Sequence, residues 1–283
     1  MKGLQKFKAI MGVSMPFALG FAAFFMLLIV GIGGLGFDLM GPVFKVDITK
    51  LSIPPTAFTD LTMINITSTE NLTASSLGLE DKYLFYLWSY SHTPSNGSMQ
   101  FEGSNFDYAN KLDTQNISIN GAISELPSKL KDIQSNFGDK MKFAQMVFLA
   151  AIFNAFLVVL LGVLACFSIK FRLLVGLGFA GITFLTMIAF AVLITMAGLN
   201  APSNLKPFIE EFDGKVDTGI SDLAIVWMAA AHMLAVVVMF TLMATGVRPM
   251  NPAFVQPSKL EREEDLLRGD RTGDYSLVHV THK

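Results

Sequence analysis

The fold of this chain is decided by an uncharged stretch, FAQMVFLAAIFNAFLVVLLGVLACFSI at positions 143–169. A helix needs about 20 apolar residues to cross the hydrocarbon core of a bilayer, and this stretch is longer. Three further runs contain no Asp, Glu, Lys or Arg, at residues 9–37, 173–205 and 223–247. The sequence therefore predicts four membrane spans, which we place at 9–37, 143–169, 173–199 and 223–247.

The overall composition agrees with residence in a membrane. Of the 283 residues, 52% are hydrophobic and only 16% are charged, whereas an ordinary soluble domain has about 25% charged residues. This composition excludes an ordinary soluble enzyme, a secreted disulfide scaffold and a disordered protein. The net charge is −2, without a basic stripe, so nucleic acid is not an expected partner.

The charges between the spans predict which side of the membrane each connection faces. Short segments rich in Lys and Arg stay in the cytosol. Residues 1–8 carry three Lys and no acid, and the turn at 170–172 carries two basic residues and no acid. Both segments are therefore expected to be cytosolic, whereas the acidic segment 200–222 is expected to be extracellular.

Glycosylation sequons predict the location of the long connection at 38–142. The pattern Asn-x-Ser/Thr occurs only within it, at Asn65, Asn71, Asn96 and Asn116. Since this pattern is glycosylated on surface loops of secretory-pathway proteins, the loop is expected to be extracellular. Both termini, including the tail at 248–283, are then cytosolic.

The long loop is expected to have a fold of its own, because bare connections of this length are rare. Alternating apolar residues predict a strand at 44–49 and a second strand at 61–67. From residue 124 the apolar residues recur at helical spacing, at Leu126, Leu130, Ile133 and Phe137. The predicted fold is an all-α transmembrane four-helix bundle with a small α+β extracellular cap in the first outer loop.

The spans offer little material for catalysis or transport. His232 is the one titratable side chain at depth, and a proton relay or metal site would need partners that the spans lack. We therefore expect His232 to be hydrogen-bonded to a neighbouring helix. The hydrolase patterns Gly-x-Ser-x-Gly and His-Glu-x-x-His are absent. These observations predict a non-enzymatic protein with no catalytic residue, cofactor or metal.

The single cysteine, Cys166, lies near the cytosolic end of the second span. One interpretation is an S-acylation site at the membrane interface. The other is a small apolar packing residue, which we favour because free cysteines are usually buried.

Two short motifs give the chain a family resemblance. The four-span plan with one large outer loop resembles the claudin-like layout, and Leu87-Trp88-Ser89-Tyr90-Ser91 is similar to the outer-loop signature Leu-Trp-x-Tyr-Cys of the fungal PalI-type family. That family includes cortical-patch proteins of eisosome-associated membrane compartments. Ser91 stands where the signature has Cys, so the chain is a divergent match. After the last span, Asn251-Pro252-Ala253-Phe254 is similar to the family's Asn-Pro-x-Phe segment.

The resemblance implies a plasma-membrane protein that organises cortical membrane domains or supports cell-wall and pH homeostasis. Its expected partners are membrane lipids, other integral membrane proteins or further copies of itself, and a cytosolic cortical scaffold bound by the tail. Trp88 and Tyr90 are expected to anchor the cap. The alternative function is an accessory or regulatory subunit of a larger membrane enzyme, pump or channel.

Overall fold

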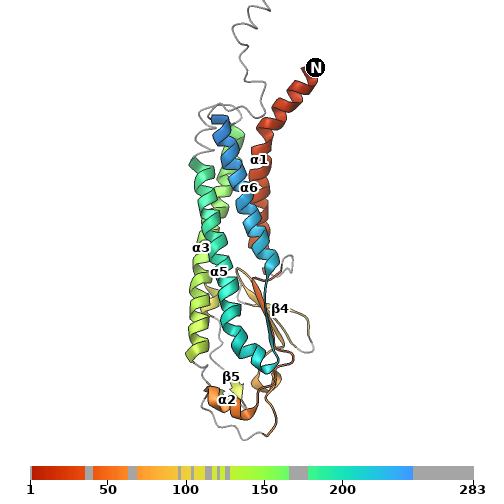
Figure 1. The fold of residues 1–283 in the computed structure, drawn as a ribbon, viewed down its shortest axis with the longest axis vertical. Helices are drawn as coiled ribbons and strands as arrows, with labels where there is room; N and C mark the ends of the chain where they lie inside the picture. Colours follow the sequence, from red (N-terminus) through yellow and green to blue (C-terminus); the bar gives the residue numbers. More distant parts are fainter. Residues whose placement is uncertain are drawn as a thin grey trace, which may run out of the picture.

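The computed structural model describes nine stretches of the chain. They are residues 2–35, 41–62, 69–94, 97–102, 105–111, 117–119, 122–124, 128–165 and 178–244. Figure 1 shows an elongated molecule in which long helices run side by side and a small sheet lies at the end away from the N-terminus.

Four long helices form the bundle. They are α1 (Lys2–Ile32), α3 (Ser128–Ala165), α5 (Ala180–Ile209) and α6 (Ile220–Ala244). Each contains an apolar segment long enough to cross a membrane. The predicted four-helix transmembrane layout is therefore confirmed, and a small cap of strands and short helices completes it.

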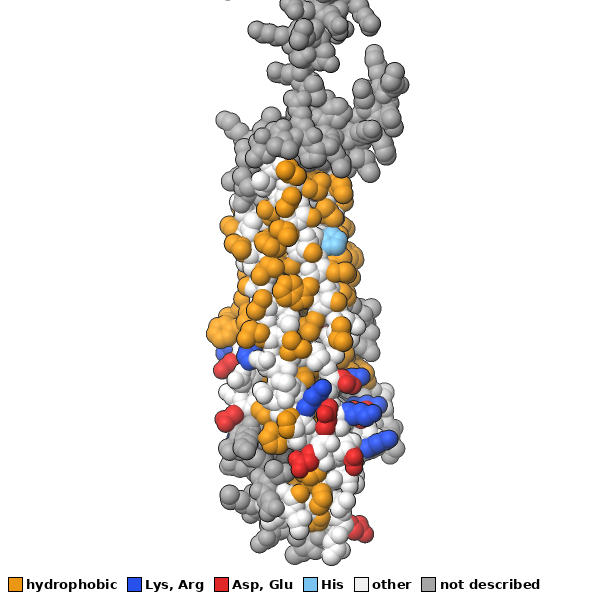
Figure 2. Space-filling model, viewed as in Figure 1, with side chains coloured by type: hydrophobic (Ala, Val, Ile, Leu, Met, Phe, Trp, Pro, Cys, Tyr) orange, Lys and Arg blue, Asp and Glu red, His pale blue; other side chains and the backbone are white. Residues whose placement is uncertain are grey.

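Large apolar side chains cover the outside of the bundle, and its interior combines alanines with large side chains such as Phe190 and Met187. Phe153 is 61% exposed and Leu185 is 66% exposed, whereas Ala151 and Ala155 are fully buried. Lipid tails are as apolar as Leu, so helices in a membrane gain more from close backbone approach than from hiding large side chains. The resulting apolar surface is visible along the bundle in Figure 2.

The cap is built on a five-stranded antiparallel sheet with the order β4-β3-β2-β1-β7. The strands are β1 (Phe44–Asp47), β2 (Lys82–Phe85), β3 (Tyr90–Thr93), β4 (Gln100–Glu102) and β7 (Lys215–Thr218). Val46 of β1 is opposite Tyr83 of β2 on one side and Val216 of β7 on the other. Consecutive strands of the first loop thus pair as neighbours, and β7 joins them at the β1 edge.

The cap predicted in the first outer loop is completed by β7, which comes from the connection between α5 and α6. Without β7, β1 would be an edge strand with unpaired backbone groups, which proteins avoid exposing. Helix α5 also continues to Ile209, well beyond the predicted span end at 199, and the 3-10 helix η4 (Glu210–Phe212) leads into β7. The two outer loops therefore fold together.

The elements predicted within the first loop have mixed outcomes. The strand expected at 44–49 is confirmed as β1 over residues 44–47, and residues 48–49 are not part of it. The strand expected at 61–67 is wrong at its start, because the helix α2 (Pro55–Thr62) occupies residues 61–62, and residues 63–67 lie outside the described part. Pro55 favours this helix, since proline fits the first helical position, where no backbone N–H is needed.

The helix expected from residue 124 begins later. Residues Ala122–Ser124 form β6, which pairs with β5 (Ile117–Ile119) in a separate two-stranded sheet. Helix α3 then starts at Ser128 and runs without a break into the membrane segment. Ile133 and Phe137 lie on this helix, as predicted, whereas Leu126 lies outside the described residues.

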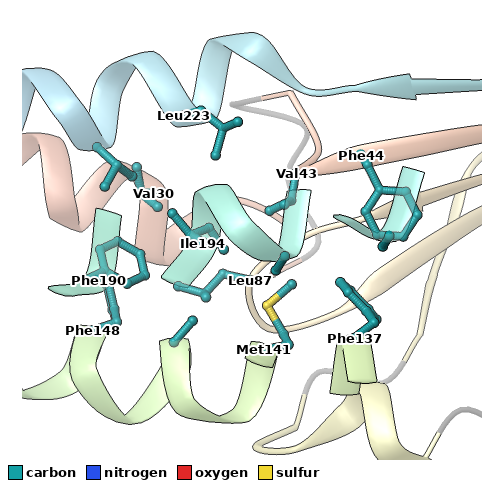
Figure 3. Packing of buried hydrophobic residues seen from close by; sticks show 14 of the residues in the cluster. Val30, Val43, Phe44, Leu87, Phe137, Met141, Phe148, Phe190, Ile194 and Leu223 are labelled. Atoms are coloured by element: carbon teal, nitrogen blue, oxygen red, sulfur yellow. The ribbon is translucent and has the colours of Figure 1, made fainter. Parts of the chain in front are cut away.

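One continuous apolar core connects the bundle to the cap (Figure 3). In the bundle, Phe148 packs against Phe190 with ring centroids 5.2 Å apart. Under the sheet, Phe44 stacks on Phe85 at 4.4 Å and meets the edge of Phe137 at 5.1 Å. Because Phe137 belongs to α3, this membrane helix packs directly against the sheet.

Candidate functional site

The β2–β3 hairpin ends in four residues, Tyr86-Leu87-Trp88-Ser89, which we call the junction loop. Tyr86, Leu87 and Ser89 are each at most 2% exposed. The backbone N–H of Tyr86 donates to the carbonyl of Ser89 at 2.9 Å and closes the loop. A hairpin loop this buried is unusual, because loops normally run over the protein surface.

The junction loop contacts the end of α1 through Ser89 and Tyr86. The Ser89 hydroxyl donates a hydrogen bond to the carbonyl of Gly34. Gly34 has φ +80°, and a Cβ atom on it would lie 2.5 Å from Cβ of Tyr86. Glycine is therefore required at this position both for the left-handed backbone and for the close approach of the loop.

Helix α3 holds the same loop through Gln145, which is fully buried. Its Nε2 donates to the carbonyl of Leu87 at 2.8 Å, and its Oε1 accepts from the backbone N–H of Asp107 at 2.8 Å. One carboxamide thus satisfies backbone groups from two separate cap segments. Gln145 is not among the site residues predicted from the sequence; the available signal was a carboxamide in an uncharged run, which also contains Asn154.

Asp107 continues this network toward the aqueous side. Its carboxylate accepts from Lys142 Nζ at 3.0 Å and from Asn110 Nδ2 at 2.7 Å. Burial on its own raises the pKa of Asp107, but the hydrogen bonds from Lys142 and Asn110 and the charge of Lys142 together hold that pKa below its ordinary value. The backbone of Asp107 has φ +63°, which places it in a conformation that Asp tolerates better than most residues.

Trp88 and Tyr90 contact different parts of the molecule. Trp88 meets Phe148 of α3 edge to face, with centroids 5.8 Å apart. Tyr90 stacks with Phe85 and Tyr108, and its hydroxyl donates to Glu102 Oε2 at 2.7 Å. Trp88 thus faces the bundle and Tyr90 the sheet, an arrangement that suits the anchor role that we predict for them.

Tyr108, in the 3-10 helix η2 (Tyr108–Lys111), completes the junction. Its hydroxyl donates to the carbonyl of Tyr86 at 2.5 Å. Burial raises the pKa of Tyr108 well above its ordinary value, so the phenol remains a hydrogen-bond donor at every physiological pH. The cap is consequently joined to the bundle by neutral hydrogen bonds as well as by packing.

A family model described as the SUR7/PalI family matches residues 13–239 of the chain. The chain belongs to the SUR7/PalI family. The matched range includes the junction loop and every strand of the five-stranded sheet. The predicted resemblance is thereby confirmed. No curated protein matches the chain.

In this SUR7/PalI family member, Ser91 takes the position where the signature has Cys. Ser91 is fully buried in β3, and its hydroxyl has no hydrogen-bond partner among the described residues. Burying a hydroxyl without a partner costs free energy, and a thiol is a weaker polar group that behaves as a small apolar side chain. The geometry therefore explains why a Cys fits here at least as well as Ser.

The predicted glycosylation sites can be located only in part. Asn71 is exposed, and its Nδ2 donates to Ser52 Oγ at 2.9 Å. The other three sites, Asn65, Asn96 and Asn116, lie outside the described residues, as does Cys166. Their occupancy and the role of Cys166 stay predictions.

His232 makes a different contact from the one expected. Its Nδ1 lies 2.7 Å from the carbonyl of Met228, four residues earlier on α6. The partner is therefore its own helix, because the i−4 carbonyl is the nearest acceptor that a histidine ring can reach on a helix. Within the described part of this SUR7/PalI member, no group of three His, Cys, Asp or Glu side chains could hold a metal ion.

The first prediction concerns Gln145. Replacing it by Leu (Gln145→Leu) leaves the Leu87 carbonyl and the Asp107 N–H buried without partners, at a cost of about 1–3 kcal/mol each. We expect a clear fall in the thermal unfolding temperature of the detergent-solubilised protein. Met146→Leu is the matched control, because Met146 is 41% exposed. Equal unfolding temperatures for the two variants would contradict a joining role for Gln145.

The second prediction is a pH dependence that comes from Asp107. A carboxyl whose pKa is lowered in the folded state stabilises the protein above its ordinary pKa of about 3.9 and loses this effect as the pH falls through the folded value. Asp107→Asn should therefore unfold at a lower temperature than the original protein at pH 7, and the difference should shrink as the pH falls below the ordinary carboxyl pKa of about 3.9.

The control for Asp107→Asn is Asp217→Asn. Asp217 pairs with Lys45 at 3.2 Å, but both side chains are more than half exposed. Exposed pairs contribute about 0–1 kcal/mol, so this variant should change little at either pH. A pH-independent effect of Asp107→Asn would show that its charge does not contribute.

Proposed function

We propose that this SUR7/PalI family member is a non-enzymatic plasma-membrane protein that organises cortical membrane domains, or supports cell-wall and pH homeostasis, through lateral contacts. Membership of the family supports the membrane role. The proposal assigns the cap to the extracellular side and both termini to the cytosol, on the basis of the basic N-terminal segment and the sequons.

The single observation that carries the proposal is the way the interior of the bundle is filled. The buried polar side chains within the described membrane helices are Gln145, Thr183 and Asp222, and Asp222 lies in the first turn of α6, at the cap end. Gln145 is used to join the cap, and Thr183 Oγ1 donates to the carbonyl of Phe179 on its own helix at 2.6 Å. Ion paths and proton relays in membranes are built from ionisable side chains. Asp222 is the one buried ionisable side chain in the described parts of these helices, and it lies at the end of α6 and not at mid-span. This arrangement favours a structural protein over a transporter or an intramembrane enzyme.

Lateral contacts are the remaining way for such a bundle to act. Its outer surface presents large apolar side chains to neighbouring lipids or helices, and its cap is fixed rigidly to the bundle by the junction loop. The proposed partners are membrane lipids, other integral membrane proteins or further copies, and a cytosolic cortical scaffold that binds the tail at 248–283. The tail lies outside the described residues.

The topology gives the third prediction. In secretory expression, endoglycosidase treatment should increase the gel mobility of the protein, and Asn71→Gln should remove one glycan. Asn71→Gln is informative because Asn71 is exposed on the cap. Asn200→Gln is the control, since Asn200 is not in a sequon. An intact protein without any mobility shift would contradict the extracellular assignment of the cap.

The fourth prediction separates the proposed function from the alternative of an accessory subunit. After purification in a mild detergent, an organiser should emerge as a homo-oligomer or in lipid-rich particles, and a fluorescent fusion should concentrate in stable cortical patches. A stoichiometric large enzyme, pump or channel in the preparation would support the accessory role instead. Ion flux in liposomes that is lost in His232→Ala would overturn both.

A further inference from the structure

A groove lies between α3 and α5 at the cap end of the bundle. Its floor is apolar and includes Phe137 and Ala201. Its polar lining comes equally from the two helices, as Asn136 and Lys140 from α3 and Asn200 and Asn204 from α5. Residues four apart share one helix face, so each helix turns two polar side chains toward the same seam.

The four polar side chains are available to a ligand. Neither the three carboxamides nor the Lys140 ammonium takes part in a side-chain hydrogen bond or ion pair with another described residue. The nearby cation on α3, Lys142, is in contrast paired with Asp107 at 3.0 Å. Lys140 is therefore the positive charge that the fold leaves open at this seam.

The groove lies where the lipid-facing surface ends. Phe143, one turn from Lys140, is 56% exposed, and Leu199, next to Asn200, is 49% exposed. Beyond this level, toward the cap, Figure 2 shows charged side chains, with smaller apolar patches among them. This is the depth of lipid headgroups, which flank the hydrocarbon core of a bilayer.

We propose that this groove binds the phosphate group of a phospholipid in the leaflet that faces the cap. Ammonium and carboxamide N–H groups donate hydrogen bonds to phosphate oxygens, and Lys is a common phosphate ligand. A cation is disfavoured, because the ammonium of Lys140 would repel it. The groove is shallow and opens to solvent, so the phosphate group alone, and not a whole lipid, would lie against its polar side chains. The acyl chains would lie along Phe143 and Leu199.

The leaflet named in this inference rests on the proposed function and its topology, but the binding does not. A purified protein in detergent has no leaflets, so a lipid-binding measurement tests the groove alone. Failure of the cortical-patch experiment would leave the lipid-binding result unchanged, and failure of lipid binding would leave the proposed function unchanged.

The fifth prediction is tested by native mass spectrometry of the full chain in detergent with added phosphatidylglycerol. The double variant Lys140→Met with Asn200→Leu should bind this lipid about tenfold more weakly than the original protein, which corresponds to about 1.4 kcal/mol. The matched control is Lys206→Met, on an exposed residue of α5 outside the groove. An unchanged unfolding temperature establishes that the double variant is folded.

Two further ligands identify what is recognised. Diacylglycerol with the same acyl chains should bind far more weakly, because it lacks the phosphate. Inorganic phosphate should displace the lipid poorly, because it cannot use the apolar surface. Three outcomes would each overturn the proposal. They are a double variant that binds phosphatidylglycerol as tightly as the original protein, diacylglycerol that binds the original protein as tightly as phosphatidylglycerol does, and ready displacement of the lipid by inorganic phosphate. If the double variant does not fold, Lys140→Met alone decides it, with the same expected direction.

Discussion

The structure depends on the hydrogen bonds that Gln145 makes from inside the bundle to two segments of the cap. A carboxamide in an apolar helix is costly unless both its donor and its acceptor are satisfied. Here the carboxamide accepts a hydrogen bond from the backbone N–H of Asp107 and donates one to the carbonyl of Leu87. The helix therefore needs the junction loop as much as the loop needs the helix, and bundle and cap share one core. Ser89 with Gly34, and Tyr108 with Tyr86, extend the same principle to neighbouring backbone groups.

The sheet of the cap also joins the two outer loops to each other. Strand β7 pairs with β1, so the connection between α5 and α6 is bonded to the connection between α1 and α3. Helices with apolar outer faces are thus fixed to one another by a sheet at one end of the bundle. A rigid cap on a uniformly apolar bundle is a suitable design for lateral recognition, because its surface keeps one shape while neighbours exchange. The proposed phosphate site lies where these two parts meet.

Membership of the SUR7/PalI family and the filled interior bear on function in different ways. The family places the chain among membrane proteins. In the interior, Gln145 and Thr183 are engaged in structural hydrogen bonds, and the proposed lateral role rests on this arrangement. The aromatic signature fits this view, since Trp88 contacts Phe148 of the bundle and Tyr90 contacts the sheet.

The sequence by itself determined the four helices, because uncharged apolar runs of this length are typical of bilayer-spanning segments, and such segments satisfy their backbone hydrogen bonds by forming helices. It also determined β1, whose alternation is a local pattern, and the helical face that carries Ile133 and Phe137. It did not determine the start of α3, the helical state of residues 61–62, or the pairing of β7 with β1. Strand partners and the contacts of Gln145 join residues far apart in the chain, and no local period encodes which of them meet. Only the tertiary structure decided those contacts, because they form only once the helices have brought both outer loops to the same end of the bundle.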